Sequence, residues 1–247
     1  MSLPVETIAG SALIITLAYT VFGLSGFGSS MTAVPLLAHL LPLRMVVPMM
    51  LLFDLLAGLI VGLKNRSAVD LREVSRLAPF LLAGMGLGVT LLVQAPERVL
   101  ILVLGIFVLS YSAWSLLVRK QPKPIATGWS LPFGVFGGIF TALFGTGGPI
   151  YTIYLARRIH DARALRASIS ILMVFTGTAR LALFTTAGLY QEDEVLLLAV
   201  LLLPCAMLGL FVGSTLNRRL PGHRVVKITW VILIVGGVSL VKRGLGF

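Results

Sequence analysis

The chain has 247 residues, of which 57% are hydrophobic and only 12% are charged. A soluble domain carries roughly twice that share of charged residues, so the composition excludes a protein whose surface faces mainly water. The formal net charge of +11 does not indicate nucleic-acid binding, because the Lys and Arg residues stand in short loops between apolar runs. Basic loops of this kind are typical of the cytoplasmic face of membrane proteins.

The apolar segments predict helices that span a membrane. About 20 apolar residues are needed to cross roughly 30 Å of hydrocarbon as a helix. Six segments meet this length approximately: 45–63, 77–94, 99–117, 167–190, 195–216 and 226–241. Two further apolar stretches, 5–41 and 129–158, are too long for one crossing and are broken in the middle.

The two breaks resemble each other in sequence. The first reads GLSGFGSSMTAVP and the second TALFGTGGP, and the FGSS of the first recurs as FGTG 117 residues later. In both, an apolar arm precedes the break, a proline and a second apolar arm follow it, and three ordinary spans come next. This repeated order indicates a duplication. We predict a first repeat over 1–118, a connecting loop over 119–128 and a second repeat over 129–247.

The basic residues indicate how the broken segments lie in the membrane. If each broken segment crossed once, Lys and Arg would divide almost evenly between the two sides. If each is a re-entrant hairpin, only Arg44, Arg98, Lys242 and Arg243 lie on one face. The other face then holds Lys64, Arg66, Arg72, Arg76, Arg119, Lys120, Lys123, Arg157, Arg158, Arg163, Arg166, Arg218, Arg219, Arg224 and Lys227. The strong bias fits a basic cytoplasmic side and favours hairpins.

Hairpins give each half one re-entrant segment and three crossings. Three is an odd number, so the second half enters from the opposite side to the first. We therefore predict an all-α integral membrane protein of two inverted repeats, each a re-entrant broken-helix hairpin plus three transmembrane helices. Residues 5–22 alone are long enough to span the bilayer, so a full crossing of the first broken segment stays an alternative.

The two breaks are the candidate binding site. Broken helices are tolerated at membrane depth only where the freed backbone groups are buried in protein or line a wet cavity. A half-helix that begins at a break directs N–H groups and a positive dipole end at that cavity, which suits an anion. We predict an anion site between the breaks, formed by Gly26, Gly28, Ser29, Ser30, Gly145, Thr146, Gly147 and Gly148. The alternative is that the glycines only permit close helix packing.

Two ionisable residues, Asp54 and Arg180, lie deep in apolar segments. A charge at the bilayer centre costs at least about 2.5–3.5 kcal/mol, so such residues are usually paired or functional. The planar guanidinium of Arg180 suits an oxyanion, and Asp54 is a candidate carrier of a coupling proton or a charge partner of Arg180. A purely structural salt bridge is the alternative. Tyr151 and Tyr154, which follow the second break, either line the cavity or anchor at the membrane interface.

Metal and cofactor sites are not expected. The single cysteine, Cys205, excludes a disulfide framework and a cysteine-rich metal site. His39, His160 and His223 have no metal-ligand spacing. The sequence contains no Walker loop that would indicate an ATP-driven pump, and no nucleophile with a partnered base that would indicate an enzyme.

The broken segments also resemble those of a known family. GLSGFGSSMTAVPLL and FGGIFTALFGTGGPIYTIYL are similar to the paired signature of the sulfite exporter TauE/SafE family, and the similarity covers essentially the whole chain. The resemblance implies two repeats of about four hydrophobic segments and the export or uptake of a small sulfur-containing anion. Ser29 and Ser30 stand where the family pattern tends to glycine, which bears on the shape of the first half-site and on ligand size.

We therefore expect a secondary transporter that moves sulfite, thiosulfate or an organosulfonate such as sulfoacetate by alternating access. The expected location is the cell membrane, specifically the cytoplasmic membrane of a bacterium. The expected partners are the anion and the lipid bilayer, and a homodimer is compatible with the sequence. A passive anion channel and a non-transporting membrane assembly partner stay as alternatives.

Overall fold

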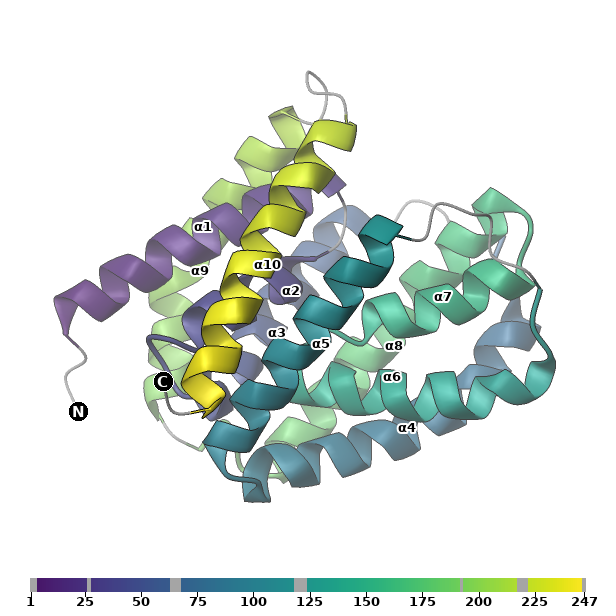
Figure 1. The fold of residues 1–247 in the computed structure, drawn as a ribbon, viewed down its shortest axis with the longest axis horizontal. Helices are drawn as coiled ribbons and strands as arrows, with labels where there is room; N and C mark the ends of the chain where they lie inside the picture. Colours follow the sequence, from purple (N-terminus) through teal and green to yellow (C-terminus); the bar gives the residue numbers. More distant parts are fainter. Residues whose placement is uncertain are drawn as a thin grey trace. The chain divides into compact units, whose positions relative to one another are not determined.

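The computed structural model describes residues 4–25, 28–62, 68–117, 124–191, 193–216 and 222–245. Over these ranges the chain is helical, with no β-strand (Figure 1). The helices are α1 (Val5–Ser25), α2 (Ser29–Leu37), α3 (Leu43–Gly62), α4 (Leu71–Gln94), α5 (Glu97–Leu117), η1 (Thr127–Trp129), α6 (Ser130–Phe144), α7 (Gly148–Arg158), α8 (Ala162–Thr186), α9 (Asp193–Leu216) and α10 (Gly222–Leu245).

The helices are those of a membrane protein. Six segments of the described chain are long and apolar enough to cross a bilayer, namely α1, α4, α5, η1 with α6, α8 and α9. Only 33% to 44% of each apolar window is buried inside the protein. The remaining apolar surface requires a lipid environment. The prediction of an all-α integral membrane protein is confirmed, and α3 and α10 also form at their predicted positions as helices of 20 and 24 residues.

α4 and α8 begin well before the apolar segments that predict them, because a polar residue caps each of these helices. The Asp70 carboxylate accepts a hydrogen bond from the Glu73 N–H, so α4 begins at Leu71. The Asp161 carboxylate accepts one from the Ala164 N–H, so α8 begins at Ala162. Capping satisfies backbone donors that have no acceptor inside the helix.

The helices form two compact units. The first consists of Met1–Phe53, Ala95–Arg119 and Glu192–Phe247, and the second of Asp54–Gln94 and Lys120–Gln191. Each unit takes helices from both halves of the sequence. The repeat boundaries stay a prediction, and residues 119–123 of the predicted connecting loop lie outside the described ranges.

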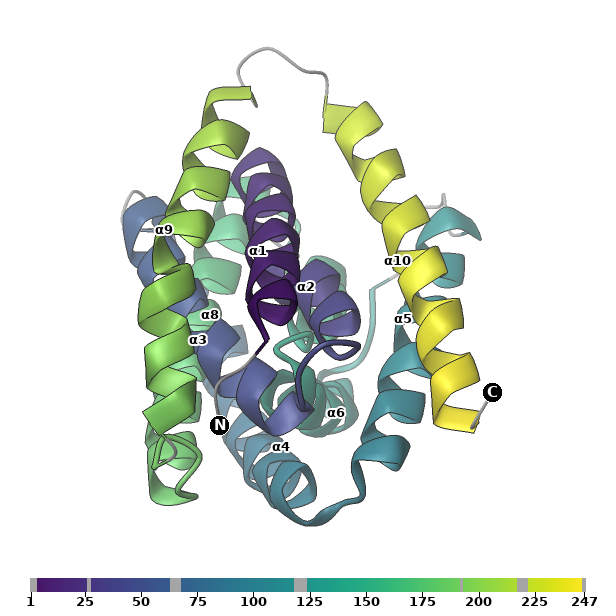
Figure 2. The ribbon, with the colours of Figure 1, turned by 90° about the vertical axis from the view of Figure 1, so that its left-hand side faces the viewer.

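In the first unit, α1 and α9 run parallel in close contact (Figure 2). A Cβ atom at Gly209 would lie 2.3 Å from the Thr16 carbonyl oxygen, and one at Gly213 would lie 2.2 Å from that of Thr20. No side chain fits at these distances, so glycine lets the two backbones touch. The second unit repeats this arrangement, since α4 and α6 run parallel and a Cβ at Gly84 would lie 2.2 Å from the Val135 carbonyl oxygen.

α5 and α10 of the first unit pack side by side and run antiparallel (Figure 2). Arg98 at the start of α5 donates to the carbonyls of Gly244 and Leu245 at the end of α10, at 2.8 and 2.7 Å. Nearer the middle, a Cβ at Gly237 would lie 3.0 Å from Leu109. If each broken segment crossed the membrane once, α5 and α10 would be the fourth and eighth crossings and would run in the same direction. Their opposite directions are those that a hairpin in the second broken segment requires, because that segment, α8 and α9 lie between them in the chain.

The first broken segment folds back on itself. α1 and α2 pack together, and a Cβ at Gly10 in α1 would lie 3.0 Å from Leu40 in the turn that follows α2. The chain therefore returns toward the start of α1 before α3 begins. Arg243 fixes this return by donating a hydrogen bond to the carbonyl of Ala38.

The second broken segment folds back in the same way inside the second unit. A Cβ at Gly137 in α6 would lie 3.7 Å from Ile150 in α7. The rings of Phe133 and Tyr154 are 6.1 Å apart. Earlier residues of α6 thus face later residues of α7, so the two arms form an antiparallel hairpin.

Part of the predicted charge distribution lies outside the described residues, namely Lys64, Arg66, Arg119, Lys120, Lys123, Arg218 and Arg219. Arg44, Arg98 and Arg243, predicted for the less basic face, all belong to the first unit and donate to backbone carbonyls. Cations at helix C-termini stabilise the last carbonyl groups. These arginines therefore have a structural function. The inverted relation of the repeats stays a prediction.

Candidate functional site

Both breaks contain a glycine in the same left-handed conformation. Gly28 has φ 92° and ψ 8°, and Gly145 has φ 70° and ψ 8°. They occupy equivalent positions in FGSS and FGTG, 117 residues apart. A residue with a Cβ atom is strained in this conformation, whereas glycine is not. The duplication seen in the sequence is thus also a duplication of backbone geometry.

The first break leads directly into α2. Ser29 and Ser30 form the first turn of this helix, and each is 4% exposed. A Cβ at Gly28 would meet nothing within 4 Å, so its conformation and not close packing requires glycine there. Gly26 lies outside the described residues.

The second break separates α6 from α7. Thr146 is 1% exposed, and its hydroxyl has no hydrogen-bond partner among the described residues. A Cβ at Gly147 would lie 1.9 Å from the Thr141 hydroxyl oxygen, so the packing explanation holds for this glycine. A Cβ at Gly148, where α7 begins, would lie 3.5 Å from the Tyr151 hydroxyl oxygen.

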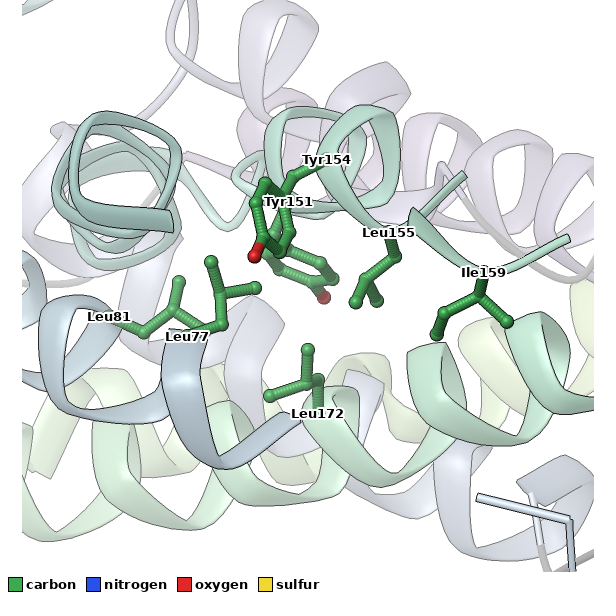
Figure 3. Packing of buried hydrophobic residues seen from close by; sticks show 7 residues of the cluster. All are labelled: Leu77, Leu81, Tyr151, Tyr154, Leu155, Ile159 and Leu172. Atoms are coloured by element: carbon green, nitrogen blue, oxygen red, sulfur yellow. The ribbon is translucent and has the colours of Figure 1, made fainter. Parts of the chain in front are cut away.

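The two tyrosines that follow the second break are buried in the second unit. Figure 3 shows Tyr151 and Tyr154 of α7 packed with leucines of α4 and α8, and they are 2% and 0% exposed. Interfacial anchoring is therefore wrong for both. The Tyr151 hydroxyl hydrogen-bonds with Thr176 of α8, and the Arg180 guanidinium is close enough to act on it electrostatically.

Arg180 and Asp54 both belong to the second unit. Arg180 is 4% exposed on α8, with its guanidinium carbon 5.3 Å from the centre of the Phe184 ring. Asp54 is half-buried on α3. The two helices meet close to both residues, since a Cβ at Gly177 would lie 2.8 Å from Leu55. Their pairing stays a prediction.

A buried charge cluster forms at the open end of the second hairpin. The Glu73 carboxylate, on a residue 4% exposed, lies 2.8 Å from Arg158 and 2.8 Å from Arg76. It also accepts a hydrogen bond of 2.7 Å from Tyr154. Arg158 donates in addition to the carbonyl of Ile125 at 3.1 Å, so it joins α7, α4 and the segment before α6.

Glu73 is not among the site residues that the sequence predicts, and Arg158 is predicted only to set membrane topology. Glu73 stands in the first turn of α4, where an acidic residue is ordinarily explained by the helix dipole. A usable signal was present, because few acidic residues lie in the segments assigned to the basic face. Asp70 and Asp161 are accounted for as helix caps, which leaves Glu73 as an unexplained carboxylate.

The apolar helices of the described chain, two pairs of which form the broken hairpins, define a multi-pass membrane protein. The chain belongs to the sulfite exporter TauE/SafE family, whose profile matches residues 11–240. It is 26% identical over 197 residues to a protein of Comamonas testosteroni named "Probable inner membrane transporter protein TsaS", which covers 79% of this chain and 82% of that protein. No solved structure gives a significant match.

These comparisons confirm the family resemblance and the location. The protein is a multi-pass cell-membrane transporter, in agreement with the six apolar helices of the described chain. The family and the relative both point to transport and away from enzyme activity.

Proposed function

We propose that this transporter moves a small sulfur-containing anion, such as sulfite, thiosulfate or an organosulfonate, across the cytoplasmic membrane by alternating access. The observation that carries the proposal is the shared backbone conformation of Gly28 and Gly145, one in each broken hairpin. A duplicated break is the usual location of the substrate site in transporters built from repeats. The family name supplies the class of substrate.

The break geometry favours an anion over a cation. α2 begins directly after Gly28, and α7 begins three residues after Gly145. The N-terminus of a helix carries a partial positive charge and N–H groups that point out of its end. Serine and threonine hydroxyls at both breaks add donors that suit oxyanions. We assign anion binding to Gly28, Ser29, Ser30, Gly145, Thr146 and Gly148, with Gly26 included from the sequence.

Arg180 supplies the full positive charge of the proposed site. It is buried on α8 and acts electrostatically on Tyr151 of α7, which supports its inclusion in the site. A guanidinium can hold two oxygens of one oxyanion at the same time. Asp54 is the proposed carrier of a coupling proton, because its half-buried carboxylate lies on the helix that meets α8 near Arg180.

Alternating access is the mechanism proposed for the movement. In inverted repeats, one half rocks against the other and opens a central site to each side in turn. The antiparallel packing of α5 and α10 supports the inverted relation, because these helices close the two predicted repeats and would be parallel in a tandem without inversion.

Anion flux into proteoliposomes tests the proposal. We expect Arg180→Ala and Ser29→Ala to raise the KM for sulfite or thiosulfate about 10-fold or more, since each removes a hydrogen bond to a charged ligand. Arg163→Ala is the matched control, because Arg163 is an exposed arginine at the start of the same helix as Arg180. Unchanged flux in both site variants would refute the site.

Proton coupling has its own experiment. We expect a pH gradient to drive sulfite or thiosulfate uptake by the wild type. We expect Asp54→Asn to abolish this dependence while exchange of anion for anion continues, because an amide does not take up a proton. Wild-type transport at the same rate with and without the pH gradient would exclude Asp54 as the carrier of a coupling proton.

A further inference from the structure

Hydroxyl side chains in the helices of this protein mostly have a hydrogen-bond acceptor. Thr16 donates to the carbonyl of Ala12 at 2.8 Å, Thr20 to that of Thr16 at 2.7 Å, and Thr141 to that of Gly137 at 2.6 Å. Each bond joins a residue to the one four places before it. This back-bonding is the ordinary solution for Ser and Thr inside an apolar helix.

Thr32 departs from this pattern inside α2, and Thr146 lies outside the helices in the second break. Each is 1% exposed, and neither hydroxyl has a hydrogen-bond partner among the described residues. Leaving a buried hydroxyl unsatisfied costs free energy, so each such group calls for an explanation. Ser11 of α1 also has a buried hydroxyl without a partner in the described chain. Of these three residues, Thr32 and Thr146 are the two that lie at a break, Thr146 in the second break and Thr32 four residues after Gly28 in the first.

Thr32 has a normal acceptor nearby and does not use it. It is the fourth residue of α2, and its backbone N–H donates to the Gly28 carbonyl at 3.0 Å. The same carbonyl is the one that back-bonding would use. Helical side chains lean toward the N-terminus of their helix, so the Thr32 side chain lies over the first turn of α2. A buried hydroxyl without a partner in the described chain thus lies about one turn from the start of the helix that the proposed function assigns to the anion.

We propose that Thr32 is a specificity-determining residue whose hydroxyl donates a hydrogen bond to an oxygen of the transported oxyanion at the first break. The inference rests on the proposed function and adds to it a donor that the break sequence FGSS does not contain. This hydroxyl has no acceptor among the described residues, and the anion supplies one. Thr146 offers a hydroxyl of the same kind at the second break.

Thr32→Val tests the inference, because valine has the shape of threonine without the hydroxyl. The stability of the protein without anion and its response to the anion should change differently. Without anion, the melting temperature in detergent should stay equal or rise, since an unsatisfied buried group is removed. With sodium thiosulfate or sodium sulfite, the rise in melting temperature that binding produces should shrink, and the KM for flux should increase about 10-fold.

Two further variants separate binding from folding. Thr32→Ser keeps the donor and should restore the wild-type KM. Ser11→Ala is the matched control, because Ser11 is 1% exposed on α1 and its hydroxyl also has no hydrogen-bond partner in the described chain, yet it lies well before the break. Ser11→Ala should leave the thiosulfate-induced shift and the KM unchanged.

Two results would overturn the inference by different routes. If Thr32→Val lowers the melting temperature without anion and leaves the thiosulfate shift and the KM at wild-type values, the hydroxyl has a structural function only. If the wild type neither transports nor is stabilised by sulfite, thiosulfate or sulfoacetate, the proposed function fails and the inference fails with it. Should Thr32→Val not fold, Thr32→Ala removes the same donor and is judged by the same two measurements.

Discussion

Glu73 of α4 and Arg158 of α7 form a part-buried ion pair of 2.8 Å that closes the open end of the second hairpin. The same carboxylate accepts from Tyr154, and the same guanidinium donates to the Ile125 carbonyl. The position of α7, and with it the position of the second break, therefore depends on a carboxylate in another helix. In the first unit the corresponding return is held by a bond from Arg243 to the carbonyl of Ala38.

Glu73→Gln should destabilise the protein by roughly 1–3 kcal/mol, because it leaves Arg158 and Arg76 without their carboxylate. Denaturation in detergent measures this loss. A double variant, Glu73→Gln with Arg158→Met, should lose less than the sum of the two single variants, since the residues are directly coupled. Additive losses would show that the ion pair contributes nothing of its own.

Gly28→Ala should destabilise the protein by about 1–2 kcal/mol, because alanine is strained in the left-handed conformation. Gly86→Ala is the matched control. A Cβ at either glycine meets nothing within 4 Å, but Gly86 lies inside α4, where alanine is favoured by about 0.5–1 kcal/mol. Melting temperatures should therefore shift in opposite directions, and equal shifts would contradict the backbone explanation.

The free energy of unfolding should fall as the pH drops below about 6.5, and His39 should account for part of this loss. Burial and, second, the nearby Arg243 guanidinium lower the pKa of His39 in the folded protein. The unfolded chain then binds more protons than the folded one as the pH falls, so stability that is present above this range is lost below it. Melting temperatures should be measured from about pH 8 to about pH 5, a range that brackets the ordinary histidine pKa of about 6.5. They should depend less on pH in His39→Gln than in the wild type. The same dependence in both proteins would rule out this histidine.

Cysteine labelling should place both ends of each broken segment on one side of the membrane. In a Cys205→Ala background, Val5→Cys and Leu40→Cys flank the first hairpin, and Ala126→Cys and His160→Cys flank the second. All four native side chains are exposed. An impermeant thiol reagent should label the first pair from one side and the second pair from the other. Labelling of positions 5 and 40 from opposite sides would establish a full crossing.

The sequence by itself determined the apolar helices and the positions of the two breaks. Segment length and the glycine and proline residues are local properties, so they identify α4, α5, α8 and α9 and the FGSS and FGTG breaks without knowledge of any neighbour. The left-handed conformation of Gly28 and Gly145 follows the same local rule, because glycine is the residue that adopts it without strain.

Only the tertiary structure decided which polar groups have partners. Glu73 and Arg158 are 85 residues apart in the chain, and nothing in either local segment specifies their contact. The same holds for Gly147, whose close packing on α6 could not be distinguished from a ligand-binding glycine until its neighbours were known. The unsatisfied hydroxyl of Thr32 was likewise invisible in the sequence, because hydrogen bonding and burial depend on distances between segments that are far apart in the chain.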